Sequence, residues 1–181
     1  EYIIKIIIDT LKENANQQLM ILAHNKNLLT YFYKSLQHKG FDSIGYYVGG
    51  MKEKDLKISE TKKIIIATYA MASEALDIKT LTTLVMATPK TDVTQSIGRI
   101  LRTKHIQPLV IDIIDNHDLF QNQWRKRLAY YTKENYQVFH SDSNNYGSYD
   151  VVYEPGQKKE PKQKKDPMKG RCLIKIPGVN C

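Results

Sequence analysis

Short apolar runs alternate with longer amphipathic stretches along the first 135 residues, and this alternation constrains the fold more than any other feature. Five runs have the length of a strand, and they occupy residues 19–23, 44–48, 63–67, 82–87 and 109–114. Most are apolar at successive positions instead of at every second one, which is typical of strands covered on both faces. Segments of helical length separate them. The sequence therefore predicts an α/β domain with a parallel sheet flanked by helices.

Two amphipathic segments predict helices that pack against this sheet. In residues 2–14, isoleucine and leucine recur at three- and four-residue steps. Residues 115–133 carry a second apolar stripe, which consists of Leu119, Phe120, Trp124, Leu128 and Tyr131. We expect that stripe to face the core. Residues 136–153 hold tyrosines and valines around a polar loop, which predicts a small hairpin. The predicted organisation is a domain over 1–135, an appendage over 136–153 and a tail over 154–181.

Composition excludes several classes of protein. Hydrophobic residues make up 41% and charged residues 25% of the 181 residues, which excludes a wholly disordered chain. No apolar run approaches the ~18 residues that a membrane span needs. Two cysteines are too few for a disulfide framework or a zinc site. These features predict an intracellular protein without a membrane segment or a metal site of its own. The chain begins at Glu1 without a methionine, which suggests a piece of a longer protein.

The net charge of +8 is concentrated near the C-terminus. Residues 154–171 hold seven Lys or Arg, three Asp or Glu, and three of the six prolines. Proline removes backbone donors and the lysines repel one another, so we expect this tail to stay solvated. Two interpretations remain open: a plain linker, or an arm that contacts nucleic acid.

Ligands of parallel α/β sheets gather at the carboxyl ends of the strands, in the loops that lead into helices, which directs attention to four such loops. They are His24–Asn25, Gly49–Gly50, residues 68–77 and residues 95–102. In the last segment Arg99 and Arg102 are three residues apart and would project from one face of a helix. Two neighbouring guanidiniums match a polyphosphate, since each offers planar bidentate donors. The alternative is a solvated basic face. Gly98 would allow close approach of another backbone.

These segments, in this order, resemble the conserved motifs of a known family. Residues 95–102 read Gln-Ser-Ile-Gly-Arg-Ile-Leu-Arg, which is similar to motif VI, Q-x-x-G-R-x-x-R, of superfamily 2 helicases. Residues 64–78 resemble motif V, residues 19–26 resemble motif IV, and residues 47–50 resemble the glycine-bearing turn that follows it. The match spans 1 to about 135 and implies the three-layer RecA-like fold, of the P-loop NTPase type, of the second helicase domain. The nearest groups are XPB- and UvsW-like helicases and those of large DNA viruses.

The resemblance implies roles for ten residues. Arg99 and Arg102 would be arginine fingers that reach the γ-phosphate of ATP, and Gln95 would orient the phosphate or the attacking water. The expected contacts to the nucleotide come from Asp77, Glu74 and Gly98. The expected contacts to nucleic acid come from Thr68, Gly49, His24 and Asn25, although Asn25 could instead cap the following helix. Ala75 stands where the family has glycine, so its methyl group would leave less room for the bound nucleotide.

The phosphate-binding half of such an enzyme is absent from the sequence. There is no G-x-x-x-x-G-K-[ST] loop, and no Asp-Glu pair follows an apolar strand to hold magnesium. The chain is therefore predicted to be the C-terminal motor lobe of an ATP-dependent helicase and inactive by itself. Mg²⁺ would be held by the N-terminal RecA-like lobe of the same polypeptide. The predicted partner is nucleic acid, with DNA favoured over RNA.

Two alternatives remain open at this point. A non-catalytic nucleic-acid-binding α/β domain would not need paired arginines at this spacing. Another doubly wound enzyme, such as a nucleotide or cofactor transferase, would need a glycine-rich loop after its first strand, where His24 and Asn25 stand instead. Richness in Lys, Ile, Asn and Tyr fits a viral source, with the protein in the host cytoplasm or the virion.

Overall fold

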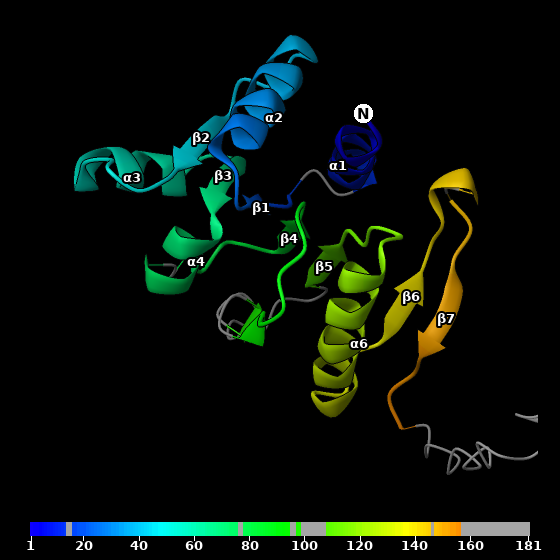
Figure 1. Ribbon diagram of the computed structural model, residues 1–181. Coiled ribbons are helices and arrows are strands. Elements are labelled where there is room, and N and C mark those ends of the chain that lie inside the picture. Colours follow the sequence, from blue (N-terminus) through cyan, green and yellow to red (C-terminus); the bar gives the residue numbers. More distant parts are fainter. Residues whose placement is uncertain (14–15, 76–77, 95–96, 99–107, 146, 157–181) are drawn as a thin grey trace, which may run out of the picture.

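A computed structural model describes residues 1–13, 16–75, 78–94, 97–98, 108–145 and 147–156 (Figure 1). Its main sheet has five strands, all parallel, in the order β2-β3-β1-β4-β5. The strands are β1 (Leu19–Ala23), β2 (Ile44–Tyr47), β3 (Ile64–Thr68), β4 (Thr83–Met86) and β5 (Leu109–Asp112). Leu19 is in register with Ile64 on one side and with Thr83 on the other. The central strand β1 is buried at every position.

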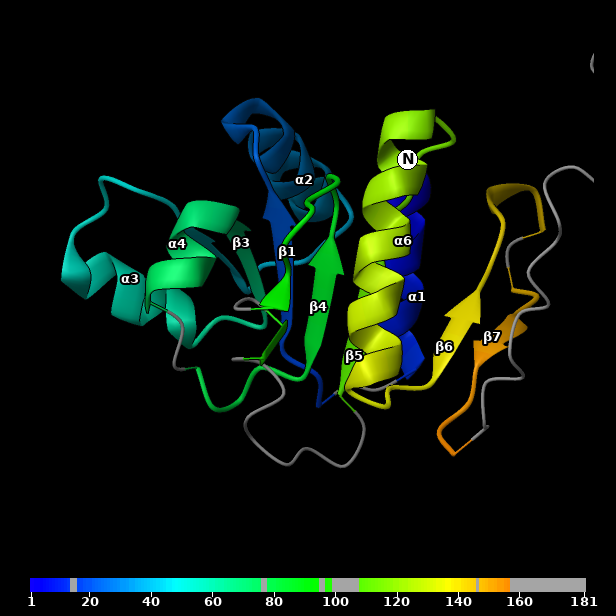
Figure 2. The same cartoon turned by 60° about the horizontal axis from the view of Figure 1, so that its bottom comes forward.

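Helices cover both faces of this sheet (Figures 1 and 2). They are α1 (Tyr2–Glu13), α2 (Lys26–His38), α3 (Glu53–Glu60), α4 (Tyr69–Ala75) and α6 (Asp118–Lys133). Successive side chains of a strand point to opposite faces, so Leu19 and Ile21 pack with α1 and α2, while Met20 and Leu22 pack with α4 and α6. The result is three layers, helix–sheet–helix. The predicted α/β class with a helix-flanked parallel sheet is confirmed.

Three details differ from the sequence-based expectation. Residues 69–75 form α4 where a loop was expected, because Ala70, Met71 and Ala72 are good helix formers. Leu119 was assigned to the core but is 56% exposed, since α6 begins only at Asp118 and its first turn extends past the packed face. β5 is only partly buried, unlike β2 at the opposite edge of the sheet.

Beyond α6, two strands pair antiparallel: β6 (Val138–His140) and β7 (Asp150–Tyr153), with the short helix η1 (Ser143–Asn145) between them. These strands fall in the range where a hairpin is predicted. Asn135 turns the chain after α6 with φ of 62°, and its side-chain oxygen accepts a hydrogen bond from the Tyr153 hydroxyl at 2.9 Å. The tail from residue 157 onward lies outside the described residues, so the division at 135 and 153 stays a prediction.

At the amino-terminal edge of the sheet, Gln18 joins three segments. Its Nε2 donates to the carbonyl oxygens of Glu60 (2.6 Å) and Lys62 (2.8 Å), and its Oε1 accepts from the Thr80 hydroxyl (2.6 Å). The residue is 8% exposed, so these contacts satisfy a nearly buried amide.

The helix α3 packs closely against β2 at Gly45. A methyl group built on Gly45 would lie 2.9 Å from Cα, Cβ and Oγ of Ser59. Only a glycine allows this contact, because a real Cβ does not approach backbone atoms that closely.

Candidate functional site

The candidate site lies at the carboxyl edge of the main sheet. Because all five strands are parallel, their carboxyl ends meet at one edge. His24 follows β1, Gly49 lies just beyond β2, Thr68 ends β3 and Asp112 ends β5. The chain leaves β4 through Thr88 toward the arginine-containing segment.

His24 and Asn25 use their side chains within the chain. The His24 ring lies against that of Tyr69, with centroids 4.6 Å apart. Its Nε2 is 3.2 Å from the carbonyl oxygen of Pro89. The side-chain oxygen of Asn25 accepts from the Asn27 N–H at 2.8 Å and caps α2, which is the alternative role that the sequence allowed for it.

Gly49 and Thr68 lie at the ends of the neighbouring strands β2 and β3. Gly49 is exposed, and among the described residues a methyl group built on it would meet the sulfur of Met71 alone, at 4.0 Å. Thr68 is half-buried, and its hydroxyl oxygen is 3.5 Å from the Met71 N–H, a long contact at the start of α4. Both positions therefore remain accessible to a ligand.

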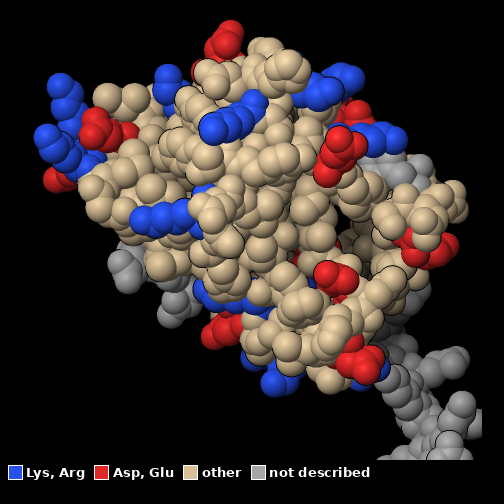
Figure 3. All heavy atoms as spheres, turned by 45° about the horizontal axis from the view of Figure 1, so that its top comes forward, with Lys and Arg blue, Asp and Glu red and all other residues tan. Residues whose placement is uncertain are grey.

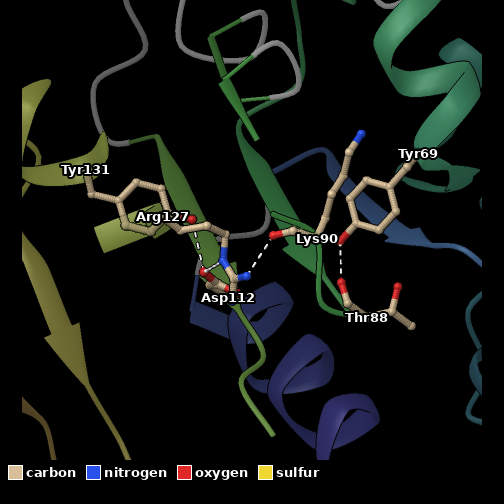
Figure 4. Close-up of polar contacts among 6 residues, drawn as sticks. All are labelled: Tyr69, Thr88, Lys90, Asp112, Arg127 and Tyr131. Atoms are coloured by element: carbon tan, nitrogen blue, oxygen red, sulfur yellow. Dashed lines mark hydrogen bonds and ion pairs between the residues drawn. The ribbon is translucent and has the colours of Figure 1, made fainter. Parts of the chain in front are cut away.

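A buried ion pair at the same edge was missed by the sequence analysis (Figure 4). Arg127 on α6 is 1% exposed, and its guanidinium donates to both carboxylate oxygens of Asp112 at 2.7 and 2.9 Å. The Tyr131 hydroxyl donates to Asp112 as well, at 3.0 Å. Arg127 also donates to the carbonyl oxygen of Lys90 at 2.7 Å. The sequence held one signal: Arg127 lies on the same helix face as Trp124 and Tyr131.

Burial governs the electrostatics of this cluster. It raises the pKa of the Asp112 carboxyl. The hydrogen bonds from Arg127 and Tyr131 and the positive charge of Arg127 oppose that shift. Burial also raises the pKa of Tyr131 and Tyr69, and the nearby Asp112 charge adds to both shifts. Both hydroxyls therefore stay protonated at neutral pH and act as hydrogen-bond donors.

Several of the predicted site residues lie outside the described part of the chain. These are Gln95, Arg99, Arg102 and Asp77. Glu74 falls within α4. Gly98 is helical, and a methyl group built there would lie 4.0 Å from the Tyr130 hydroxyl, so its nearest described neighbour is a side chain and not another backbone.

The start of the arginine-containing segment is described. Thr94 and Ile97 are helical, and the Ile97 N–H donates to the carbonyl oxygen of Val93 at 2.9 Å. The Asp92 carboxylate accepts from the Thr94 N–H at 3.0 Å, and this hydrogen bond lowers the pKa of Asp92. Val93 and Ile97 are both buried, which anchors this first turn in the core.

The face shown in Figure 3 has no continuous basic band, because its Lys and Arg side chains are interspersed with Asp and Glu. The distribution of charge on this face therefore does not indicate where a nucleic acid would bind. Within the described residues, His, Cys, Asp and Glu side chains form no group of three that could bind a metal ion. In the same part of the chain, no helix combines the length and apolar character that a membrane crossing needs.

Comparison with known proteins identifies viral relatives. No family model matches the chain. It is 37% identical over 142 residues to a protein of Acanthamoeba polyphaga mimivirus named Putative ATP-dependent RNA helicase L396, covering 76% of this chain and 26% of that protein. It is 27% identical over 137 residues to Putative ATP-dependent RNA helicase QP509L of African swine fever virus (isolate Pig/Kenya/KEN-50/1950), covering 70% and 27%. The chain spans about a quarter of the length of each relative.

Solved helicase structures share the fold. The crystal structure of T4 UvsW matches with a TM-score of 0.60 and 22% identity, covering 75% of this chain and 32% of that one. The C-terminal domain of the S. cerevisiae Dbp5 L327V variant, bound to Gle1 H337R and IP6, matches with a TM-score of 0.56 and 17% identity, covering 72% and 77%. This chain has the fold of a C-terminal RecA-like helicase domain. The predicted resemblance to a C-terminal RecA-like helicase domain is thereby confirmed, and the two relatives described above are viral. The names of those homologues specify RNA, so they do not support the predicted preference for DNA.

Proposed function

We propose that this RecA-like domain is the C-terminal motor lobe of an ATP-dependent nucleic-acid helicase or translocase. One observation carries the proposal: the parallel sheet brings the ends of β1, β2 and β3 to the same edge from which β4 leads into the Q-x-x-G-R-x-x-R segment. A ligand that crosses this edge can therefore meet the loops after several strands at once.

On the nucleic-acid side, Gly49 and Thr68 are the strongest candidates. Gly49 is exposed and leaves room for a phosphate close to its backbone N–H, and within the described part of the chain the Thr68 hydroxyl makes a single, long contact. His24 and Asn25 are weaker candidates, since both side chains already have partners. Backbone N–H groups and hydroxyls bind phosphates rather than base edges, so sequence preference is slight. The strand can be DNA or RNA.

On the nucleotide side, Arg99 and Arg102 would stabilise the charge that develops on the transferring phosphoryl group, with Gln95 orienting the phosphate or the attacking water. The nucleotide would also be contacted by Asp77, Glu74 and Gly98. ATP is the substrate, and Mg²⁺ would be held by an N-terminal lobe, since this sequence has neither the phosphate loop nor the Asp-Glu pair that bind it in such enzymes. The viral relatives named as ATP-dependent helicases support the use of ATP.

Movement along the nucleic acid would follow from having the two halves of the ATP site on different lobes. The arginines belong to one lobe and the phosphate loop to the other, so bound ATP draws the lobes together and hydrolysis releases them. Repeated closing and opening would move the strand contacts of this lobe relative to those of its partner.

The test uses the full-length protein that contains this chain, with Arg99→Ala and Arg102→Ala as variants and the exposed Arg125→Ala as the control. We expect each motif variant to lower the kcat of nucleic-acid-stimulated ATP hydrolysis about a hundredfold or more, because such fingers act on the transition state. Arg→Lys substitutions should rescue poorly, since lysine lacks the planar fork. Affinity for single-stranded DNA and RNA without nucleotide should stay at the wild-type level.

Two outcomes would contradict the proposal. Wild-type turnover by both alanine variants would leave a nucleic-acid-binding domain without a role in catalysis. Metal-dependent ATP hydrolysis by the 181-residue chain alone would contradict the need for a second lobe.

A further inference from the structure

The segment that leaves β4 toward the arginines is held by side chains from three other elements. The Tyr69 hydroxyl donates to the carbonyl oxygen of Thr88 at 2.6 Å. The His24 Nε2 lies 3.2 Å from the carbonyl oxygen of Pro89. The guanidinium of Arg127 donates to the carbonyl oxygen of Lys90 at 2.7 Å. Three consecutive carbonyl groups are thus each bound by a different side chain (Figure 4 shows the first and third).

This arrangement fixes the path of a segment that would otherwise be loosely held. Pro89 has no N–H, which removes one backbone hydrogen bond that could orient the segment. A carbonyl oxygen can only accept, so His24 Nε2 must carry the hydrogen in this contact. A second hydrogen bond, from the His24 backbone N–H to the Thr88 hydroxyl at 3.1 Å, holds the same segment to the end of β1.

The donor side chains are themselves fixed in place. Tyr69 is 2% exposed, and its ring contacts both the His24 ring and the Lys90 ammonium, which lies 4.9 Å from the ring centroid. Arg127 is fixed by its two hydrogen bonds to Asp112. A donor that is already oriented loses little freedom when it binds, so each hydrogen bond constrains the carbonyl that accepts it.

The constrained segment leads directly into the helical turn that precedes the arginines. Asp92 binds the Thr94 N–H, and the buried side chains of Val93 and Ile97 anchor the turn. The direction of the chain at Lys90 therefore sets the position at which this helical turn begins. Arg99 and Arg102 come two and five residues after Ile97 in the sequence.

We propose that Tyr69, His24 and Arg127 are positioning residues for the arginines of motif VI. They contact neither ATP nor nucleic acid in this role, and they act by holding the carbonyl oxygens of residues 88–90. The inference rests on the proposed function, since it assigns a purpose to the direction of Arg99 and Arg102.

The experiment uses Tyr69→Phe in the full-length protein, which removes one hydroxyl and keeps the ring that contacts His24 and Lys90. We expect kcat for ATP hydrolysis, at saturating ATP and saturating single-stranded RNA, to fall about fivefold, the effect of one hydrogen bond of ordinary net strength. KM for ATP should stay unchanged. The exposed Tyr31→Phe is the matched control. Rates are measured well below the unfolding temperature, where a purely structural role would leave kcat unchanged.

Two further variants keep the proposal testable if Tyr69→Phe does not fold. His24→Phe keeps an aromatic ring against Tyr69 but loses the donor to Pro89, and His24 is exposed, so the fold should tolerate it. Arg127→Lys cannot bind Asp112 through a fork and reach Lys90 at once, and Arg125→Lys on the exposed face of α6 is its control. Each should lower kcat at least as much as Tyr69→Phe.

A mutant cycle with the Arg99→Ala/Arg102→Ala double variant separates a failure of this inference from a failure of the proposed function. If Tyr69 acts through these two arginines, adding Tyr69→Phe to the variant that lacks both should lower kcat no further. Full additivity of the two losses, or wild-type kcat for Tyr69→Phe and His24→Phe, would overturn the inference while the function stands. Wild-type kcat for Arg99→Ala and Arg102→Ala would instead overturn the proposed function.

Discussion

Gln18 offers a measurable test of how the amino-terminal edge of the sheet is held together. Its amide joins the chain before β3 to the chain before β4 through three side-chain hydrogen bonds. Gln18→Ala removes all three. Each contributes about 0.5–1.5 kcal/mol net, and the freed carbonyl groups of Glu60 and Lys62 regain only part of their hydration at this nearly buried position. We therefore expect the free energy of unfolding to fall by about 2–4 kcal/mol.

The assay is equilibrium unfolding in urea, followed by the fluorescence of Trp124, the single tryptophan of the chain. Gln37→Ala, the same substitution at an exposed position of α2, should change the free energy of unfolding by no more than about 0.5 kcal/mol.

A second variant separates hydrogen bonding from packing. Gln18→Glu keeps the size and shape of the side chain but replaces the donor with an oxygen that faces two carbonyl oxygens. It should destabilise the chain at least as much as alanine does, because one carboxylate oxygen keeps the Thr80 hydroxyl as its donor while the other faces the carbonyl oxygens of Glu60 and Lys62 at a nearly buried position. A Gln18→Glu variant more stable than Gln18→Ala would show that packing, not hydrogen bonding, holds this edge.

Two further predictions concern packing and pH. Gly45→Ala should lower the free energy of unfolding by about 1–3 kcal/mol, because its methyl group would overlap Ser59. The control, Gly49→Ala, should be nearly neutral. Equal losses of the two variants in urea unfolding would contradict the close contact between Gly45 and Ser59. Burial, with a smaller effect of Tyr136, raises the pKa of Tyr130 to about 12. A raised folded-state pKa contributes stability that is complete below the unfolded value of about 10 and is lost as pH rises through 12. Stability should therefore fall over that range and fall less steeply in Tyr130→Phe; identical pH profiles would refute this assignment.

The sequence predicted the sheet well because its strands are marked by continuous apolar runs. Residues 19–23 are apolar at every position and bounded by Gln18 and His24, so the limits of β1 were read correctly. The short helix α4 was missed because seven residues hold too few turns for a periodic pattern, and only the propensities of Ala70 and Ala72 indicated it.

The candidate site was predictable only where a motif marks it. Arg127 belongs to no motif, and its partners Asp112 and Lys90 become neighbours only after β4, β5 and α6 have packed together. The contacts of the His24 ring with the Pro89 carbonyl and with Tyr69 were not predicted either, while its expected contact to nucleic acid stays a prediction. Such contacts depend on tertiary geometry, which local spacing does not determine.

The order of the strands also governs how the domain can be made on a ribosome. β1 pairs with β3 and β4 and never with β2, the strand that follows it in the chain. During synthesis, its five apolar residues therefore remain without a strand partner until Ile64 has left the exit tunnel, and the second side stays open until Thr83 follows. Non-local pairings of this kind form slowly and leave apolar side chains and unpaired strand edges exposed. We expect the nascent domain to depend on chaperones until Thr83 has left the tunnel.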